Sequence, residues 1–136
     1  MTAPSTEITA AVRQRAGQRC EYCRMHQALQ GGTFHIEHTT PKSRGGLSDF
    51  DNLAFACISC NLRKSDRIEA IDPATGAVVP LFNPRVHVWA DHFSWSEFEI
   101  DGKSPTGRAT IGALDFNSER RIFIRQAEAL LALFPP

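Results

Sequence analysis

The sequence predicts an α+β fold organised around a short hairpin and the helix that follows it. Residues 34–38 and 53–56 have the composition and the bounding turn residues of short strands, and residues 58–67 can form a helix directly after the second strand. Two Cys-x-x-Cys pairs lie beside this unit, at positions 20–23 and 57–60. Two strands and one helix are too small to fold securely alone, so we expect the cysteine pairs to hold them together.

Helices are expected on both sides of this unit. Residues 5–16 repeat apolar side chains on one face, and Gly17 suits a helix C-terminus. Near the end of the chain, residues 118–134 carry the clearest helical pattern, with an apolar stripe that we expect to lie in the core. This stripe consists of Phe123, Ala127, Leu130 and Phe134.

Shorter elements are predicted between these helices. Residues 77–81 have the composition of a strand, as do residues 95–100, which we expect to end in a turn at Asp101-Gly102. Residues 106–114 are predicted to form a short helix. The second half of the chain is therefore predicted to be an α/β segment that ends in a helix.

Length and composition are those of an ordinary globular protein. With 136 residues, 42% hydrophobic and 22% charged, we expect a single domain, in which residues 5–67 form a core and residues 68–136 an extension packed on it. No apolar run approaches the roughly 20 residues of a membrane span. Residues 1–7 lack the charged-then-apolar layout of a secretory signal, so we expect a cytoplasmic protein with no membrane contact.

Charge is distributed unevenly along the chain, although its net value is zero. Residues 8–67 contain nine Lys or Arg and five Asp or Glu, a balance of +4, whereas residues 68–136 have a balance of −3. A local basic patch of this kind is common in nucleic-acid-binding proteins. The alternative is that these charged side chains are only solvated at the surface and bind no partner.

The four cysteines predict a metal site. Disulfides are disfavoured in a cytosolic chain, and one Cys-x-x-Cys pair alone could be redox-active. Two such pairs instead favour a tetrahedral zinc site formed by Cys20, Cys23, Cys57 and Cys60. Four sulfur ligands leave no position for water or substrate, so one structural zinc ion per chain is expected. Tyr22, inside the first pair, is expected to pack beside the zinc.

An acid, a histidine and two asparagines near the second pair have the chemistry of phosphodiester hydrolysis. That reaction needs a base to activate water and a cation to offset charge on the phosphate. His38 can be the base, because its intrinsic pKa of about 6.5 leaves it largely neutral at cellular pH. Glu37 and Asn61 offer hard oxygen ligands to a hydrated Mg²⁺ or Mn²⁺ ion. Asn52, in the loop of the hairpin, is suited to hydrogen-bond the backbone there.

These residues resemble the motif of the HNH endonuclease family, and the upstream cysteine pair is similar to its four-cysteine, zinc-containing branch. The resemblance covers about residues 20–67. The motifs that carry it are Glu37-His38, Pro41-x-x-Arg44-Gly45-Gly46, Asn52-Leu53, Cys57-x-x-Cys60-Asn61-x-x-Lys64 and Cys20-x-x-Cys23.

The resemblance implies a ββα-metal fold and a DNA endonuclease. It implies that His38 is the general base, that Glu37 and Asn61 are ligands of the catalytic metal, and that Asn52 orients the loop. Many members have Asp in place of Glu37 and His in place of Asn61; an Asn oxygen favours Mg²⁺ or Mn²⁺ over softer metals. Residues 81–114 resemble an extension found in a subgroup of bacterial HNH proteins.

Four further residues have a possible role at the site. Arg44, Lys64 and Arg67 are candidates for contacts with DNA phosphates, and the alternative for each is a solvated surface position. His35 shares a strand face with Glu37, so it either touches the metal or a phosphate, or it is a hydrogen-bonded structural histidine.

The hypothesis from the sequence is thus a Mg²⁺- or Mn²⁺-dependent DNA endonuclease with a separate structural zinc. One rival is a non-catalytic zinc module that binds nucleic acid or a partner protein, and another is a degenerate nuclease fold with a toxin-like or regulatory role. The cysteines and the basic half fit all three. Only the nuclease requires Glu37, His38 and Asn61 together. No dimer surface is evident in the sequence.

Overall fold

A computed structural model describes residues 3–136 and confirms the predicted α+β class. Within these residues the chain forms five α-helices and three two-stranded antiparallel sheets. The elements of the first half are α1 (Thr6–Ala16), β1 (His35–His38), β2 (Leu53–Ala56) and α2 (Ile58–Lys64), with short 3₁₀ helices at Gln27–Leu29, Lys42–Arg44 and Phe50–Asn52.

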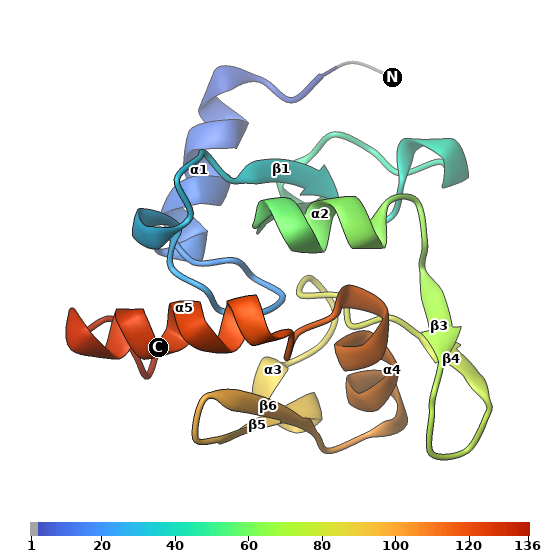
Figure 1. Cartoon of the computed structure of the whole chain (residues 1–136). Helices are drawn as coiled ribbons and strands as arrows, with labels where there is room; N and C mark the ends of the chain where they lie inside the picture. Colours follow the sequence, from blue (N-terminus) through green and yellow to red (C-terminus); the bar gives the residue numbers. More distant parts are fainter. Residues whose placement is uncertain (1–2) are drawn as a thin grey trace.

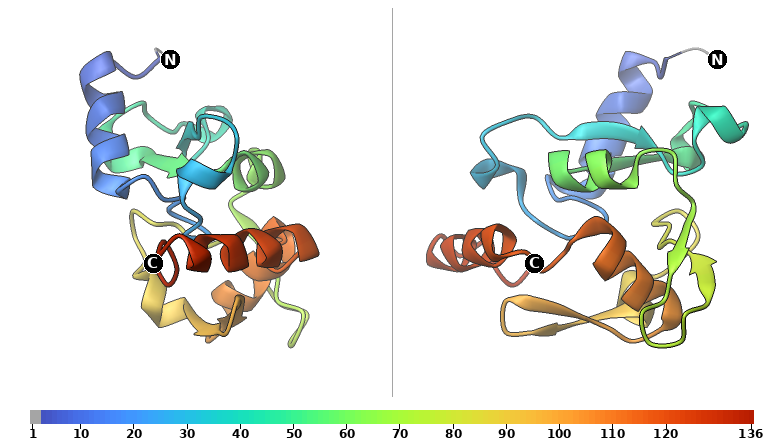
Figure 2. Two further views of the ribbon diagram at one scale, coloured as in Figure 1. Left: turned by 60° about the vertical axis from the view of Figure 1, so that its left-hand side comes forward. Right: turned by 45° about the vertical axis from the view of Figure 1, so that its right-hand side comes forward.

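The second half of the chain contains the remaining elements, which are β3 (Glu69–Ile71), β4 (Val78–Pro80), α3 (Trp89–His92), β5 (Phe93–Ser96), β6 (Glu99–Gly102), α4 (Pro105–Leu114) and α5 (Glu119–Leu130). Figures 1 and 2 show α1, β1 and α2 on one side of the molecule and α4, α5 and the β5–β6 hairpin on the other. None of the helices in residues 3–136 is both long and apolar enough to span a membrane.

Helix α1 begins and ends where its capping residues predict. The Ser5 hydroxyl accepts a hydrogen bond from the Ile8 amide at 3.1 Å, which satisfies one of the free donors at the helix N-terminus. Gly17 ends the helix in a left-handed conformation with φ of 62°. Val12 is fully buried and fixes the helix against the core.

The predicted hairpin and helix are present with nearly the expected bounds. β1 pairs with β2 in antiparallel register, from His35 opposite Ala56 to His38 opposite Leu53. All four residues of β2 are buried, which agrees with the apolar run that predicted it. α2 follows at once but ends at Lys64, three residues before the predicted end, because Ser65 adopts a positive φ of 49° that cannot continue a helix.

Two predicted strands in the second half of the chain differ from the structure. The predicted strand at 77–81 is β4, and it pairs with β3, which was not predicted because three residues carry no detectable alternation. The predicted single strand at 95–100 is wrong. The chain reverses at Glu97, which has a positive φ of 55°, and forms the β5–β6 hairpin.

The predicted turn at Asp101-Gly102 is therefore also wrong, because both residues belong to β6. Gly102 lies opposite Phe93, and Asp101 lies opposite Ser94. Two short strands joined by a tight reversal have nearly the same alternation of apolar and polar residues as one longer strand, so the pattern alone did not separate them.

The predicted core stripe of the last helix is wrong at two of its four residues. α5 ends at Leu130 rather than at 134, and Phe123 and Leu130 are 70% and 88% exposed. The face that α5 turns inward carries charged residues instead, namely Arg121, Arg125 and Glu128, each 1% exposed. These side chains have polar partners in the core, which the amphipathic pattern of the helix cannot reveal.

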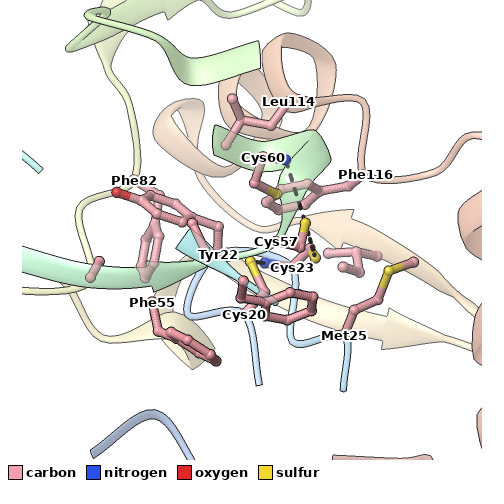
Figure 3. Close-up of a cluster of buried hydrophobic side chains, with 14 of the residues drawn as sticks. Cys20, Tyr22, Cys23, Met25, Phe55, Cys57, Cys60, Phe82, Leu114 and Phe116 are labelled. Carbon is pink, nitrogen blue, oxygen red and sulfur yellow. Dashed lines mark hydrogen bonds between the residues drawn. The ribbon is translucent and has the colours of Figure 1, made fainter. Parts of the chain in front are cut away.

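The hydrophobic core joins the two halves around the cysteines. Figure 3 shows Tyr22 and Phe55 from the first half beside Phe82, Leu114 and Phe116 from the second, with the sulfur atoms of the cysteines among them. The hairpin–helix unit and the C-terminal elements thus bury apolar surface against each other, and removing either would expose it.

A matched pair of leucine substitutions tests this arrangement. We expect Leu114→Ala to lower the free energy of unfolding by about 2–5 kcal/mol, because the buried side chain leaves a cavity. Leu130→Ala should change it by no more than about 0.5 kcal/mol, since that side chain is exposed. Urea denaturation followed by circular dichroism measures both. Equal losses for the two variants would show that the helix faces are assigned incorrectly.

Candidate metal centre and active site

The four cysteines meet in the core and are positioned to bind one metal ion. All four are free and buried, and their sulfur atoms lie within 4.8 Å of one another. The Sγ atoms of Cys23 and Cys57 are 3.7 Å apart. A tetrahedral zinc ion with sulfur ligands at about 2.3 Å requires sulfur–sulfur distances of about 3.8 Å. The Cys23–Cys57 distance matches this value, and the 4.8 Å bound on the other distances places all four sulfur atoms close enough to share one ion.

Both cysteine pairs fold into tight loops that turn an amide toward a sulfur. The Cys23 amide donates to Cys20 Sγ at 3.5 Å, and the Cys60 amide donates to Cys57 Sγ at 3.4 Å. Cys57 is also the N-cap of α2, so the second loop is the start of that helix. Each pair thus has an amide donor that can hydrogen-bond a sulfur atom acting as a metal ligand.

The first loop is bound to the edge of β2 through the residue that follows Cys20. The Glu21 amide donates to Phe55 O at 2.8 Å, and the Glu21 carboxylate accepts from the Phe55 amide at 2.8 Å. Arg85, from the second half, pairs with the same carboxylate. Glu21 thus fixes the position of the first cysteine pair relative to the hairpin.

A buried arginine from α5 completes the surroundings of the sulfur atoms. Arg121 Nη2 donates to Cys60 Sγ at 3.3 Å and to Cys57 Sγ at 3.6 Å. Burial lowers the pKa of this guanidinium, but the charges of the neighbouring cysteines outweigh that effect and raise the pKa overall. Arg121 lies about sixty residues after the second cysteine pair, so the sequence alone does not indicate this contact.

Three of the predicted site residues, Glu37, His38 and Asn61, line one pocket of about 390 Å³, whereas the predicted catalytic residue Asn52 is not part of its lining. Glu37 and His38 reach it from the end of β1, and Asn61 reaches it from the middle of α2. His35 also lines this pocket and is exposed. Residues from a strand and a helix more than twenty positions apart are thus brought together, as the motif predicts.

Glu37 is 7% exposed, and each oxygen of its carboxylate has a partner. The Tyr22 hydroxyl donates to Oε1, and the Lys64 ammonium lies 3.3 Å from Oε2. Burial raises the pKa of Glu37, while the charge of Lys64 and the hydrogen bond from Tyr22 act in the opposite direction. Tyr22 lies between the first two cysteines, so it connects the sulfur cluster directly to the carboxylate.

His38 lies at the end of the strand with a fixed ring. Its Nε2 is 2.8 Å from the hydroxyl oxygen of Ser48, in the loop between the strands. Burial and the charges of Lys42 and Lys64 lower the pKa of His38 below its ordinary value. The imidazole is therefore neutral at neutral pH, which is the state that can accept a proton.

Asn52 holds the loop that connects the two strands through four hydrogen bonds. Its Oδ1 accepts from the Thr40 amide at 2.9 Å and from the Thr39 hydroxyl at 2.8 Å. Its Nδ2 donates to Thr40 O at 3.0 Å and to Leu47 O at 2.8 Å. Gly46 is required beside it, because a Cβ there would lie 1.7 Å from Thr40 O.

The predicted phosphate contacts fall into two groups. Lys64 is 2% exposed and is occupied by Glu37 and by His38 O, so in this structure it is not the surface contact that the sequence suggested. Its buried ammonium compensates the Glu37 charge instead. Arg44 and Arg67 are exposed, and their guanidinium groups donate to nearby backbone carbonyls.

Four contacts at the two centres were missed from the sequence. Tyr22 was expected only to pack beside the zinc, and its position between two cysteines was the one available signal that it lies near the site. The position of Lys64 one turn after Asn61 on α2 puts both residues on one helix face, but it does not indicate that Lys64 pairs with Glu37. The contacts of Ser48 and Arg121 depend on the folding of a loop and on a distant helix, so no local pattern indicates them.

Comparisons with known proteins agree with the motif. Residues 20–67 match the sequence model of the HNH endonuclease family, which confirms the predicted resemblance for this segment. The chain is 23% identical over 117 residues to the Septu protein PtuB of Bacillus thuringiensis, covering 85% of this chain. It spans 43% of the length of that relative. No solved structure gives a significant match.

The hydrogen bonds of Asn52 generate a stability prediction. We expect Asn52→Asp to lower the free energy of unfolding by about 2 kcal/mol or more, because the carboxylate loses both donors and faces two backbone carbonyls. The exposed neighbour Asp51, changed to Asn, is the control and should remain near wild-type stability. Urea midpoints that are indistinguishable for Asn52→Asp and Asp51→Asn would contradict this account of the loop.

Proposed function

We propose that this protein is a metal-dependent HNH endonuclease that hydrolyses phosphodiester bonds of DNA. The observation that carries the proposal is the pocket where Glu37, His38 and Asn61 converge, within the segment that matches the HNH family. A plain zinc module has no need for a base, a carboxylate and an amide oxygen at one pocket.

His38 is proposed as the general base. Its pKa is lowered, and its ring is held by Ser48. A neutral imidazole can take a proton from an attacking water at the ring nitrogen that Ser48 does not engage. The hydrogen bond to Ser48 restricts the ring of a residue that lines the pocket, which reduces the entropic cost of reaching the reactive geometry.

Glu37 and Asn61 are proposed to hold a Mg²⁺ or Mn²⁺ ion, which when bound would stabilise negative charge on the phosphate and the leaving oxygen. Their carboxylate and amide oxygens are hard ligands of the type these ions prefer. A carboxylate has about four lone-pair sites, so Glu37 can retain Tyr22 and Lys64 and still present a lone pair to the pocket. The remaining volume leaves room for waters and a phosphate.

Nucleic acid is the proposed substrate because exposed cations surround the pocket. Lys42 forms part of the pocket wall, and Arg44 and Arg67 lie exposed in the adjoining segments. Long cationic side chains of this kind contact phosphates and position the backbone without reading the bases. His35, exposed in the same pocket, is proposed as an additional contact to the metal or to the phosphate.

The four-cysteine cluster is proposed to hold one structural zinc ion. Four sulfur ligands close the coordination shell, so zinc at this site would support the fold and take no part in the reaction. The ion would join the first cysteine loop to the start of α2. The first of these segments also holds Glu37 through the Tyr22 hydroxyl, and the second places Asn61 in the pocket lining.

One observation favours the rival proposal of a non-catalytic zinc module that binds nucleic acid or a partner protein. The Glu37 carboxylate is already neutralised by Lys64, as it would be if its role were structural. The two proposals differ in whether DNA is cut and in whether His38 matters, and a nicking assay separates them.

We expect the purified protein to convert supercoiled plasmid to the nicked form in the presence of Mg²⁺ or Mn²⁺ and to stop when a chelator is added. His38→Ala should lower the nicking rate by about 100-fold or more, the usual contribution of a general base. His26→Ala, which changes a histidine outside the pocket, is the matched control and should retain wild-type nicking. Metal-independent nicking, or equal activity in the two histidine variants, would exclude the proposed mechanism.

For the structural metal, elemental analysis of the purified protein should give about one zinc per chain. Cys57→Ser should lose the zinc and unfold at lower urea concentration, because metal binding contributes directly to folding. Ser59→Ala, in the same loop but without a ligand atom, should retain both. A Cys57→Ser protein with full zinc content and wild-type stability would rule out the four-sulfur site.

A further inference from the structure

Arg121 occupies an unusual position for an arginine, since it is 1% exposed and lies in the centre of the core. Its Nη1 donates to Leu114 O at 2.8 Å and to Asp115 O at 3.1 Å, at the C-terminus of α4. Its Nη2 is directed to the sulfur atoms of Cys57 and Cys60. The planar guanidinium therefore joins the end of α4 to the second cysteine loop.

The charge of the proposed zinc site explains why a cation is needed there. A zinc ion with four thiolates carries a formal charge of −2, and a buried net charge is costly unless other charges or hydrogen bonds compensate it. Among the described residues, Arg121 is the cationic side chain that donates hydrogen bonds to the sulfur atoms. The amides of Cys23 and Cys60 supply the other donors, but they carry no net charge.

Arg125 shows what an arginine in a purely structural role looks like on the same helix. It is equally buried, one turn after Arg121, and its guanidinium donates to Phe98 O at 2.9 Å and to Phe116 O. No hydrogen bond joins Arg125 to a cysteine sulfur in residues 3–136. The two arginines therefore match in burial and in carbonyl contacts and differ in their contact with the sulfur atoms.

We propose that Arg121 is a positioning residue of the four-cysteine site, which retains the metal by compensating thiolate charge and by donating to two of the sulfur ligands. This inference rests on the proposed zinc ion. It gives the C-terminal segment a role, because the segment that matches the HNH family, residues 20–67, contains all four ligands but not the cation that compensates them. α5 is thus an integral part of the metal site.

The test compares Arg121→Met, Arg121→Lys and Arg125→Met in the full-length, zinc-loaded protein. Zinc loss to an excess of the indicator 4-(2-pyridylazo)resorcinol is followed by absorbance. We expect Arg121→Met to lose zinc about 10–100-fold faster than wild type, because removing a partner of a metal ligand typically lowers metal affinity by that factor. Arg121→Lys should be intermediate, because it keeps the charge without the planar pair of donors. Arg125→Met should lose zinc at nearly the wild-type rate.

A second readout is independent of folding stability. With Co²⁺ in place of zinc, the thiolate-to-cobalt charge-transfer band should move to longer wavelength in Arg121→Met and to a smaller extent in Arg121→Lys, because sulfur atoms without the hydrogen bonds are stronger electron donors. Arg125→Met should leave the band unchanged. If Arg121→Met does not fold, Arg121→Lys still decides the question through the band position and the zinc-loss rate.

Two results would overturn the inference. The first is an equal rate of zinc loss in Arg121→Met and Arg125→Met, with both rates increasing as the urea midpoint falls. That result would show that Arg121 acts only through folding stability. The second is a cobalt band that does not move in either Arg121 variant. A wild-type protein that binds neither zinc nor cobalt would instead refute the structural metal itself, so the failure of the two proposals is distinguishable.

Discussion

Four cysteine sulfur atoms from two segments 34 residues apart lie close together in the core. The same two segments position the side chains of the candidate active site. The first segment carries Tyr22 to the Glu37 carboxylate. The second is the N-terminus of α2, the helix that presents Asn61 and Lys64 to the same region. A change in the sulfur cluster would therefore move groups on both sides of the pocket.

The pocket itself is held by a small number of buried polar contacts. Lys64 and Glu37 form an ion pair with side chains 3% and 7% exposed. Such pairs add little net stability, but removing one partner leaves an uncompensated charge, so they define the local arrangement strongly. Asn52 has the corresponding function in the loop, where one side chain satisfies four polar groups. Together they keep His38 and Glu37 in fixed orientations before any substrate binds.

Much of the hairpin–helix unit could be predicted from the sequence, because its signals are local. Glycine and proline residues bound β1, an apolar run marks β2, and the cysteine spacing gives a metal site that needs no tertiary information. The residues of the candidate site were predicted for the same reason, and the structure brings Glu37, His38 and Asn61 to one pocket. Their chemical roles are proposals that the nicking assay addresses.

The errors have a common physical origin in long-range polar contacts. The buried face of α5 was predicted from its apolar stripe. Phe123 nevertheless faces solvent, because Arg121 and Arg125 have buried sulfur and carbonyl partners from other segments. Lys64 was predicted to contact DNA phosphate or to lie at a solvated surface position, whereas its buried position depends on a carboxylate from β1. Partners that lie far apart in the sequence leave no periodic signal, so these residues could be placed only with the structure.

A closed, four-sulfur metal site is proposed to organise the molecule. X-ray absorption at the zinc edge of the purified full-length protein tests it most directly. For zinc bound by the four cysteines, we expect four sulfur neighbours at about 2.3 Å and no nitrogen or oxygen neighbour in the first coordination shell. A first shell that contains nitrogen or oxygen, or a purified protein without zinc, would contradict it.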